Sequence, residues 1–357
     1  MGNTIHFSEV HRKQLLDGFA NKSETDSLFS HELDMEFSGV KTVHVKSLKT
    51  EKLQDYNRAK SVDSGSRYGT TKEVGDEEQT FTMTQDKSLS LSIDKGNNAE
   101  QFDMKKAGKV MSAHRDEQIV PEVDTYRLAK WAKDGGIHTE LAAAVSKSNI
   151  VSSIVDMHNA MLDKNVPDQI TLVIARKYLP MLKLSDEWVG LDSLGGKTLP
   201  KGTLGEFDGM AVKPMPTNRM PENVAWMMIY KGAVIAPVKI NTFKGHVDPP
   251  GLSGDLLEFR MMYDAFVLGK KAAGVAVAVE KGFVQATPTI TMSGAKATIA
   301  SAGGTIYYTT NGSDPRYSVD VKAYTGEITL VAGDQLRAYA TAEGKYSSAV
   351  AEKDYEG

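Results

Sequence analysis

The chain has 357 residues, of which 41% are hydrophobic and 25% charged, and this length and composition predict a soluble protein with two domains of unequal size. A formal net charge of −4 argues against a general nucleic-acid-binding protein, which usually carries excess positive charge. The sequence has no cysteine, which excludes disulfides, thiolate zinc sites and cysteine nucleophiles and is typical of a protein made in a reducing cytosol. We identify no signal peptide and no apolar run long enough to cross a membrane.

Residues 1–36 are polar and mixed in character, which predicts a terminal arm. Two short helical patterns occur in it, one running from Ser8 to Phe19 and the other surrounding Leu28, Phe29 and Leu33.

Residues 37–95 have the pattern of a long β-hairpin with a polar tip. Val43 and Val45 alternate with polar residues in the first strand, and the connecting segment Ser61–Glu78 is rich in small and polar residues. The second strand places apolar side chains on alternate positions, at Phe81, Met83, Leu89, Leu91 and Ile93. A two-stranded ribbon is at best marginally stable in water, so something must cover its apolar face. Two alternatives stay open: these five residues contact a neighbouring copy of the chain, or the hairpin folds back on its own domain.

Residues 96–284 predict a mixed α+β core. The segment 99–133 is helical in pattern, with a break or kink near Val120 because Pro121 follows. A second helix is predicted after Asn149 as its N-cap, and His158 on the apolar face of this helix is interpreted as a packed side chain. Strands are predicted at 170–174, on both sides of a turn within 223–240, and in 256–279.

Residues 285–357 are dominated by Thr, Ser, Ala, Gly and Tyr in short alternating runs. Strands at this spacing, separated by turn residues, predict a small all-β sandwich. We place the domain boundary near residue 284.

No motif in the sequence predicts catalysis. Gly195-Gly196-Lys197-Thr198 resembles the end of a phosphate loop, but the full motif requires glycine where Leu191 stands. The eight histidines are scattered, and no pair has the spacing that places two metal ligands on one helix face. We therefore expect no enzyme activity, no metal and no cofactor.

The segment 255–282 resembles the C-terminal strands of tailed-bacteriophage major capsid proteins, above all in Tyr263–Gly274, which reads YDAFVLGKKAAG. The order of the predicted elements agrees with that family. The resemblance implies the Johnson fold, with residues 1–36 as the N-arm, 37–95 as the E-loop, and 96–284 as the P-domain with its spine helix and the A-domain.

The same resemblance implies a function. Many copies would form hexamers and pentamers of an icosahedral shell around double-stranded DNA, which the protein would contact weakly. A portal and a scaffolding protein or domain would be further partners, and no membrane would be involved. The protein would be found in the virion after assembly in the cytoplasm of the bacterial host.

The C-terminal segments Gly303–Pro315, Tyr324–Leu330 and Leu336–Ala340 resemble the immunoglobulin-like domain at the C-terminus of chitobiases. In that family the domain is an accessory, so the resemblance implies a module displayed on the outer surface of the shell. The alternatives are a structural protein of a phage tail or baseplate, a carbohydrate-binding surface protein, or an enzyme with an unrecognised fold.

Overall fold

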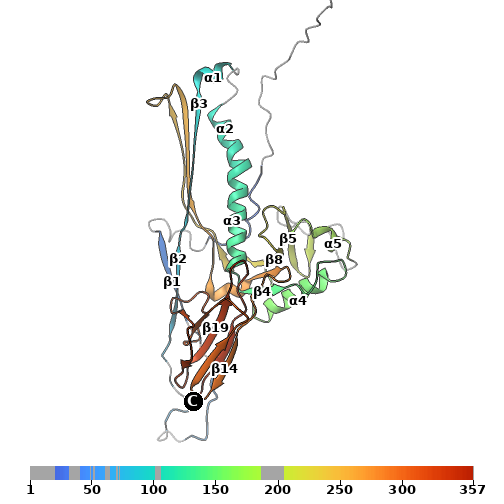
Figure 1. Ribbon diagram of the computed structural model, residues 1–357, viewed down its shortest axis with the longest axis vertical. Helices are drawn as coiled ribbons and strands as arrows, with labels where there is room; N and C mark the ends of the chain where they lie inside the picture. The colour runs from blue at the N-terminus through green and yellow to red at the C-terminus, as the bar shows by residue number, and fades with distance from the viewer. Residues whose placement is uncertain are drawn as a thin grey trace, which may run out of the picture.

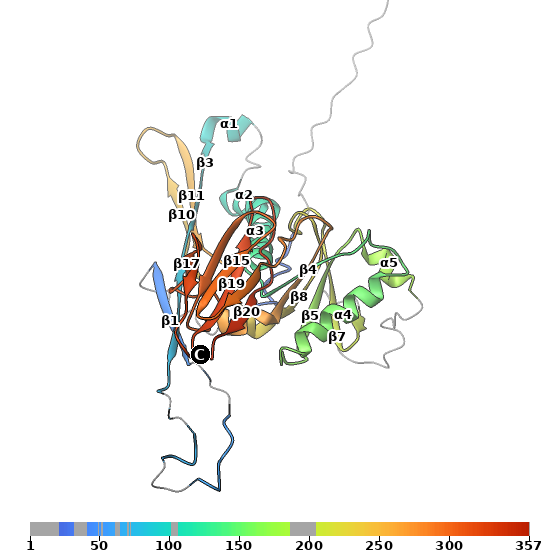
Figure 2. The same ribbon diagram turned by 60° about the horizontal axis from the view of Figure 1, so that its bottom comes forward.

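The structure, a computed structural model, describes residues 21–31, 41–48, 50, 53–60, 65–69, 71, 73–100, 106–185 and 205–356. A long helix and a tall β-ribbon rise side by side from a body that is built around a six-stranded sheet (Figure 1). A C-terminal β-sandwich lies at the opposite end from the ribbon (Figure 1), and Figure 2 shows it beside a two-stranded hairpin.

The body is organised by a mixed sheet with the strand order β4–β13–β8–β5–β7–β6. β8 is antiparallel to both of its neighbours, whereas β5 pairs with β7, and β4 with β13, in parallel. All of β13 and nearly all of β8 are buried, which requires cover on both faces of the sheet. The strands are β4 (Ile137–Glu140), β5 (Ile170–Ala175), β6 (Gly205–Phe207), β7 (Met210–Met215), β8 (Val224–Tyr230) and β13 (Val275–Val279).

One face of this sheet is covered by α4 (Ile150–Leu162) and the short helix α5 (Leu179–Lys183), which pack on the buried side chains of β5 and β7. The helix and the strand at 170–174 confirm the sequence prediction. Asn149 precedes α4 as expected, but its side-chain oxygen accepts the backbone N–H of Ser146 at 2.7 Å instead of capping the helix.

The long helix continues through Val120, so the break that the sequence suggested there is absent, and the irregularity before Pro121 is a wider helical turn. α2 (Ala107–His114) continues into α3 (Val120–Lys133) through one π-helical turn, Arg115–Ile119. The N–H of Val120 donates to the carbonyl of Arg115, five residues back. This wider turn directly before Pro121 accommodates a ring that has no N–H to donate and that collides with a regular preceding turn. α1 (Lys95–Glu100) precedes this helix in the chain.

The predicted hairpin 37–95 is divided between two sheets, which corrects its strand pairing. β1 (Thr42–Leu48) and β2 (Asp76–Thr82) form the two-stranded hairpin. β3 (Gln85–Asp94) leaves it and pairs with β11 (Gly254–Tyr263), which also pairs with β10 (Val238–Val247). β11 has ten residues with alternating apolar side chains, so it matches β3 over its whole length.

Short elements connect the ribbon with the body. β9 (Val234–Ile235) pairs with β12 (Phe266–Val267), and 3₁₀ turns at Lys231–Ala233 and Gly269–Gly274 lie next to them.

The described part of the predicted arm, residues 21–31, contains a turn where a helix was expected around Leu28. Leu28 and Phe29 are buried in the core of the body, and Ser30 forms a parallel bridge with Ile235. Tertiary burial therefore outweighs the local helical pattern. The rest of the predicted arm, residues 1–20 and 32–36, lies outside the described residues.

The C-terminal strands form two facing sheets, β14–β15–β18 and β17–β16–β19–β20, whose side chains share one apolar core. This is the all-β sandwich that the sequence predicts; the boundary near 284 stays a prediction. The strands are β14 (Thr289–Ser293), β15 (Lys296–Ala300), β16 (Thr305–Thr309), β17 (Lys322–Ala323), β18 (Ile328–Thr329), β19 (Gln335–Thr341) and β20 (Ala351–Asp354).

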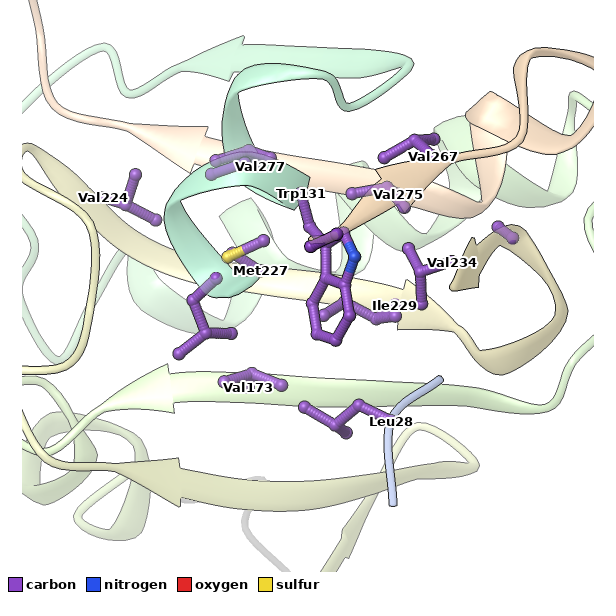
Figure 3. Packing of buried hydrophobic residues seen from close by; sticks show 14 of the residues in the cluster. Leu28, Trp131, Val173, Val224, Met227, Ile229, Val234, Val267, Val275 and Val277 are labelled. Carbon is purple, nitrogen blue, oxygen red and sulfur yellow. The ribbon is translucent and has the colours of Figure 1, made fainter. Parts of the chain in front are cut away.

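The end of α3 enters the largest core through Trp131, which is fully buried (Figure 3). The indole lies among side chains of β5, β8 and β13, including Val173, Ile229 and Val275. Its Nε1 donates to the carbonyl of Ile235 at 3.3 Å. Trp131 thus joins the helix, the sheet and the segment that leads to the ribbon.

Replacing Trp131 by alanine should lower the free energy of unfolding by about 3–5 kcal/mol, because a large cavity would open between helix and sheet. Urea unfolding of the unassembled protein, followed by circular dichroism, measures this. Leu184→Ala is the matched control, since Leu184 is 61% exposed and its loss should cost less than about 0.5 kcal/mol. Equal losses in both variants would contradict the assignment of Trp131 to the core.

Candidate functional site

Within the residues that the structure describes, no three histidine or acidic side chains are placed to hold a metal ion. The same residues contain no helix that is long and apolar enough to span a bilayer. The glycine-rich segment 195–198 lies outside them. The candidate functional features are instead the two faces of the ribbon sheet and the polar side-chain contacts that join separate segments to the body.

One face of the ribbon sheet is apolar across all three strands. Residues directly opposite one another share a face, so Phe243, Phe259 and Leu89 form one row of it. Leu257 and Leu91 belong to the next row.

The apolar packing of the long helix on this ribbon face is with the central strand β11, and Glu122 also pairs with Lys87 of β3 at 3.1 Å. Val123 of α3 packs with Met261 and Tyr263 of β11 in a small buried cluster. On the edge strand β10, Phe243 and Val247 are 50% and 78% exposed. The face is therefore covered in the middle and open along β10.

The opposite face of the ribbon is polar over most of its length, apart from Ile240, Leu256 and Met262, and it carries pairs of opposite charge. Arg260 donates to the carboxylate of Asp86 from Nε at 3.0 Å and Nη2 at 2.7 Å, which lowers the pKa of Asp86. His246 lies 3.3 Å from the carboxylate of Glu258. The two faces thus differ sharply in the partners that they can accept.

The five residues predicted to contact a neighbouring copy occupy two different settings. Phe81 and Met83 are buried in a cluster formed with β1, β9, β11 and β12 of the same chain, and Ile93 is 6% exposed. No neighbouring copy is needed to cover these three. Leu89 and Leu91 are half-buried on the apolar ribbon face. Contact with a second copy stays a prediction, and it now depends on these two.

Gln79, midway along the β1–β2 ladder, adds polar contacts to the apolar packing of Val43 and Phe81 against the body. Gln79 donates from Nε2 to the carbonyl of Val267 at 3.0 Å and accepts the N–H of Gly269 through Oε1 at 2.7 Å. Its amide therefore satisfies both a backbone acceptor and a backbone donor, as a neighbouring strand would.

A buried polar cluster fastens residues 21–31 to α3. Asp124 is fully buried and accepts hydrogen bonds from Ser23 Oγ at 2.8 Å, Thr25 Oγ1 at 2.6 Å and the N–H of Glu24 at 2.8 Å. Arg219 Nη1 donates to the same carboxylate at 3.0 Å. A buried carboxylate needs such a set of donors, so this cluster fixes where the N-terminal segment joins the body.

The two histidines that the fold encloses are packed side chains. His158 is 6% exposed, as its position on α4 predicts, and its Nδ1 lies 2.7 Å from the carboxylate of Asp208. His138 Nε2 lies 2.7 Å from the carbonyl of Ala132, and its Nδ1 lies 3.1 Å from the carbonyl of Ser347. His138 therefore joins the end of α3 to the C-terminal sandwich.

Sequence reasoning missed Phe243 and Val247, because the strand was expected to end at Ile240. A register shift between Val238 and Ile240 interrupts the alternation there, which hides the rest of the strand. The charged pair of Asp124 with Arg219 left no signal, since its partners are 95 residues apart.

Solved structures with a similar fold include several phage proteins. The chain is 16% identical to a protein of Mycobacterium phage Che8, with a TM-score of 0.57 over 76% of this chain and 96% of that one. It is 12% identical to a protein of the mature capsid of bacteriophage PhiM1, with a TM-score of 0.59 over 78% and 93%. For the capsid of cyanophage P-SCSP1u the identity is 12% and the TM-score 0.53, over 77% and 93%.

Residues 279–352 match a family model described as the chitobiase/beta-hexosaminidase C-terminal domain. A search of curated proteins found no match.

The body therefore has the Johnson fold of tailed-phage major capsid proteins, as the order of elements predicts. The β-sandwich that follows is an immunoglobulin-like domain of the chitobiase type, and its strands β14–β20 are called the C-terminal module below.

Replacing Asp124 by asparagine should lower the free energy of unfolding by about 3 kcal/mol or more, because the buried guanidinium of Arg219 would lose its counter-charge. Urea unfolding measures the loss. Glu327→Gln is the control: it breaks an exposed pair with Lys296, which should change stability by less than about 1 kcal/mol. Similar losses in both variants would contradict a fastening role for Asp124.

His138 should make the protein less stable below about pH 6.5. Desolvation lowers the pKa of His138, helped by Arg316 and opposed by the carbonyls of Ala132 and Ser347 and by Asp134. The unfolded chain then binds the proton more strongly than the folded chain, so stability is complete above the ordinary pKa of about 6.5 and falls as the pH drops below it.

Unfolding curves between pH 5 and 8 test this in full-length protein and in His138→Gln, which keeps a donor for Ala132. The variant should show a smaller loss at low pH, whereas the exposed His44→Gln should behave as the parent does. An unchanged pH profile in His138→Gln would contradict the prediction.

Proposed function

We propose that the protein is a major capsid protein, which assembles in many copies into the icosahedral shell of a tailed phage around double-stranded DNA. The observation that carries the proposal is the Johnson fold combined with an apolar ribbon face that one chain leaves open at Phe243 and Val247. The role is structural, with neither a catalytic centre nor a cofactor.

The physical argument for this role is that a closed shell needs particular contacts between its subunits. A shell needs subunits that contact several neighbours by symmetry, and repeated modest contacts add up to a stable particle. An edge strand with exposed apolar side chains is a hazard to a solitary protein, because it invites pairing with another chain. In a shell the same surface is buried against a second copy in hexamers and pentamers, where we also place Leu89 and Leu91.

The remaining partners follow from this role. The protein would reside in the virion after assembly in the cytoplasm of the bacterial host, with a portal and a scaffolding protein or domain. Contact with packaged DNA would be weak, since the formal charge of −4 provides no general attraction for phosphate. The C-terminal module would face the outside of the shell.

The alternatives are a phage tail or baseplate protein and a carbohydrate-binding surface protein. Against the second, Tyr307 and Tyr339 of the module stack with ring centres 5.6 Å apart within a groove that the module shares with α3 and β2. This aromatic pair therefore faces the body of its own chain. Electron microscopy of expressed protein separates the alternatives, because only the capsid role produces closed shells.

The decisive variant is Phe243→Asp, which places a charge on the open part of the apolar ribbon face. Expressed parent protein should form shells, whereas this variant should remain as small oligomers with a circular dichroism spectrum and melting temperature close to those of the parent. Burying the unpaired carboxylate between copies would be too costly.

Thr242→Asp is the matched control, since Thr242 is the exposed neighbour on the same strand and faces the polar side beside Arg260. It should assemble as the parent does. Shells formed equally by both variants would exclude the apolar face as an assembly contact, and a parent protein that never forms shells with any scaffold would overturn the proposal.

A further inference from the structure

The C-terminal module is held to the body by side chains at one end of α3. Tyr317 donates its hydroxyl to the carbonyl of Asp134 at 2.7 Å, and Arg316 Nη1 donates to the carbonyl of Gly136 at 2.8 Å. The carbonyls at a helix C-terminus lack partners within the helix and carry a partial negative charge. A cation and a hydroxyl are the groups that suit this position.

The guanidinium is aimed by its own loop. Asp314 accepts hydrogen bonds from Arg316 Nε at 3.1 Å and from Nη2 at 2.7 Å, which leaves Nη1 pointing to the body. The Arg316 side chain is only 12% exposed. This is a preformed contact with a fixed direction, unlike the loose pair of a flexible linker.

A second contact lies at the other side of the module. Tyr346 exchanges backbone hydrogen bonds with the segment that leaves the body, accepting from Gln285 N–H at 2.9 Å and donating to Phe283 O at 2.8 Å. Its hydroxyl donates to the carbonyl of Glu222 at 3.2 Å. The neighbouring Ser347 contacts His138.

Two aromatic side chains of the module pack against the core of the body and not against the core of the module itself. The core of the module is formed by other residues, among them Leu336, Ile299 and Tyr324. Tyr317 and Tyr346 pack instead against the core of the body that contains Trp131. The module thus contributes two aromatic side chains to a core that is not its own. A groove of about 1170 Å³ between the module and the body is lined by residues of both contacts, among them Tyr317 and Tyr346.

The β1–β2 hairpin meets the module at the first of these contacts. A methyl group added to Gly269 would lie 2.7 Å from Cβ of Tyr317 and 3.0 Å from Oε1 of Gln79. Gly269 is also the residue whose N–H binds Gln79. The body, the hairpin and the module therefore come together around one glycine.

We propose that the C-terminal module is a brace within the subunit: Tyr317, anchored with Arg316 on the end of α3, packs against Gly269 and so supports the β1–β2 hairpin at Gln79 in a fixed direction. This proposal does not depend on the capsid role. It differs from the expectation of a detachable accessory, because removing the module would uncover part of the core of the body and take away one of the contacts that orient the hairpin, leaving those of Gln79 and of the buried Val43 and Phe81. A two-stranded hairpin has little stability without such support.

Hydrogen exchange on the full-length protein tests the brace. Tyr317→Ala should raise the exchange rates of amides in β1 and β2 on the order of tenfold, because their local opening would lose the support of the module. Protection in β15 and β19 should persist, since Tyr317 is not part of the module's own core. Val319→Ala, two residues further along and 51% exposed, is the control and should change neither.

Gly269→Ala probes the same contact from the body without altering the module. Its methyl group should displace Tyr317 and Gln79 and also accelerate exchange in β1 and β2. Acceleration in both variants supports the brace. Acceleration in Gly269→Ala alone, with the module still protected in Tyr317→Ala, would mean that Gln79 holds the hairpin unaided and would overturn it. If Tyr317→Ala also exposes β15 and β19, Gly269→Ala decides, and an unchanged hairpin in that variant overturns the proposal.

Discussion

The position of α3 on the sheet is the constraint on which the rest of the chain depends, because the ribbon packs at Val123, the N-terminal segment binds at Asp124 and the C-terminal module binds at Asp134. Trp131 fills the core between the helix and the six-stranded sheet. Immediately beyond it, Gly136 approaches Ala272 so closely that an added methyl group would lie 2.3 Å from the carbonyl of Ala272. Because the two backbones are in such close contact, the helix can take only one position relative to the sheet. A packed interior transmits a displacement to its neighbours and does not absorb it. The ribbon, the N-terminal segment and the C-terminal module then take their directions from that position.

The buried charges around Asp124 have a role that stability alone does not explain. A buried ion pair is often no more stable than a well-packed apolar replacement, because desolvation offsets much of the attraction. What the cluster provides is selectivity. Asp124 accepts donors from three consecutive residues, Ser23 to Thr25, and a shift of one residue would leave a buried carboxylate with the wrong partners. The exit point of the N-terminal segment is thereby defined to within one residue.

The local sequence pattern was sufficient to predict an element where that element can be recognised from its own residues, without knowledge of the segment it pairs with. The buried strand at 170–174, the helix from 150 and the alternation from Phe81 to Ile93 were recognisable because burial imposes the period of the element on its own residues. The pairing of β3 with β11 was not recognisable, since Leu89 meets Phe259 only through a separation of 170 residues. The continuity of the helix past Pro121 was equally hidden, because a π-helical turn has no residue signature of its own.

The residues proposed to contact a second copy also divide into those that the sequence pattern identifies and those that only the structure identifies. Period two identified Leu89 and Leu91 as one face of a strand, but only the three-dimensional register shows that Phe243 lies in the same row and is the more exposed of the group. The open row is narrow and the reverse face is charged, so a single chain exposes few apolar groups while it waits for partners. Association also costs less when the contacting elements are already ordered. A ribbon packed on α3 and a hairpin held at Gln79 and Gly269 meet that condition within a single chain. In the proposed shell the ordering entropy would therefore be lost during folding, and the contact energy would be left for assembly.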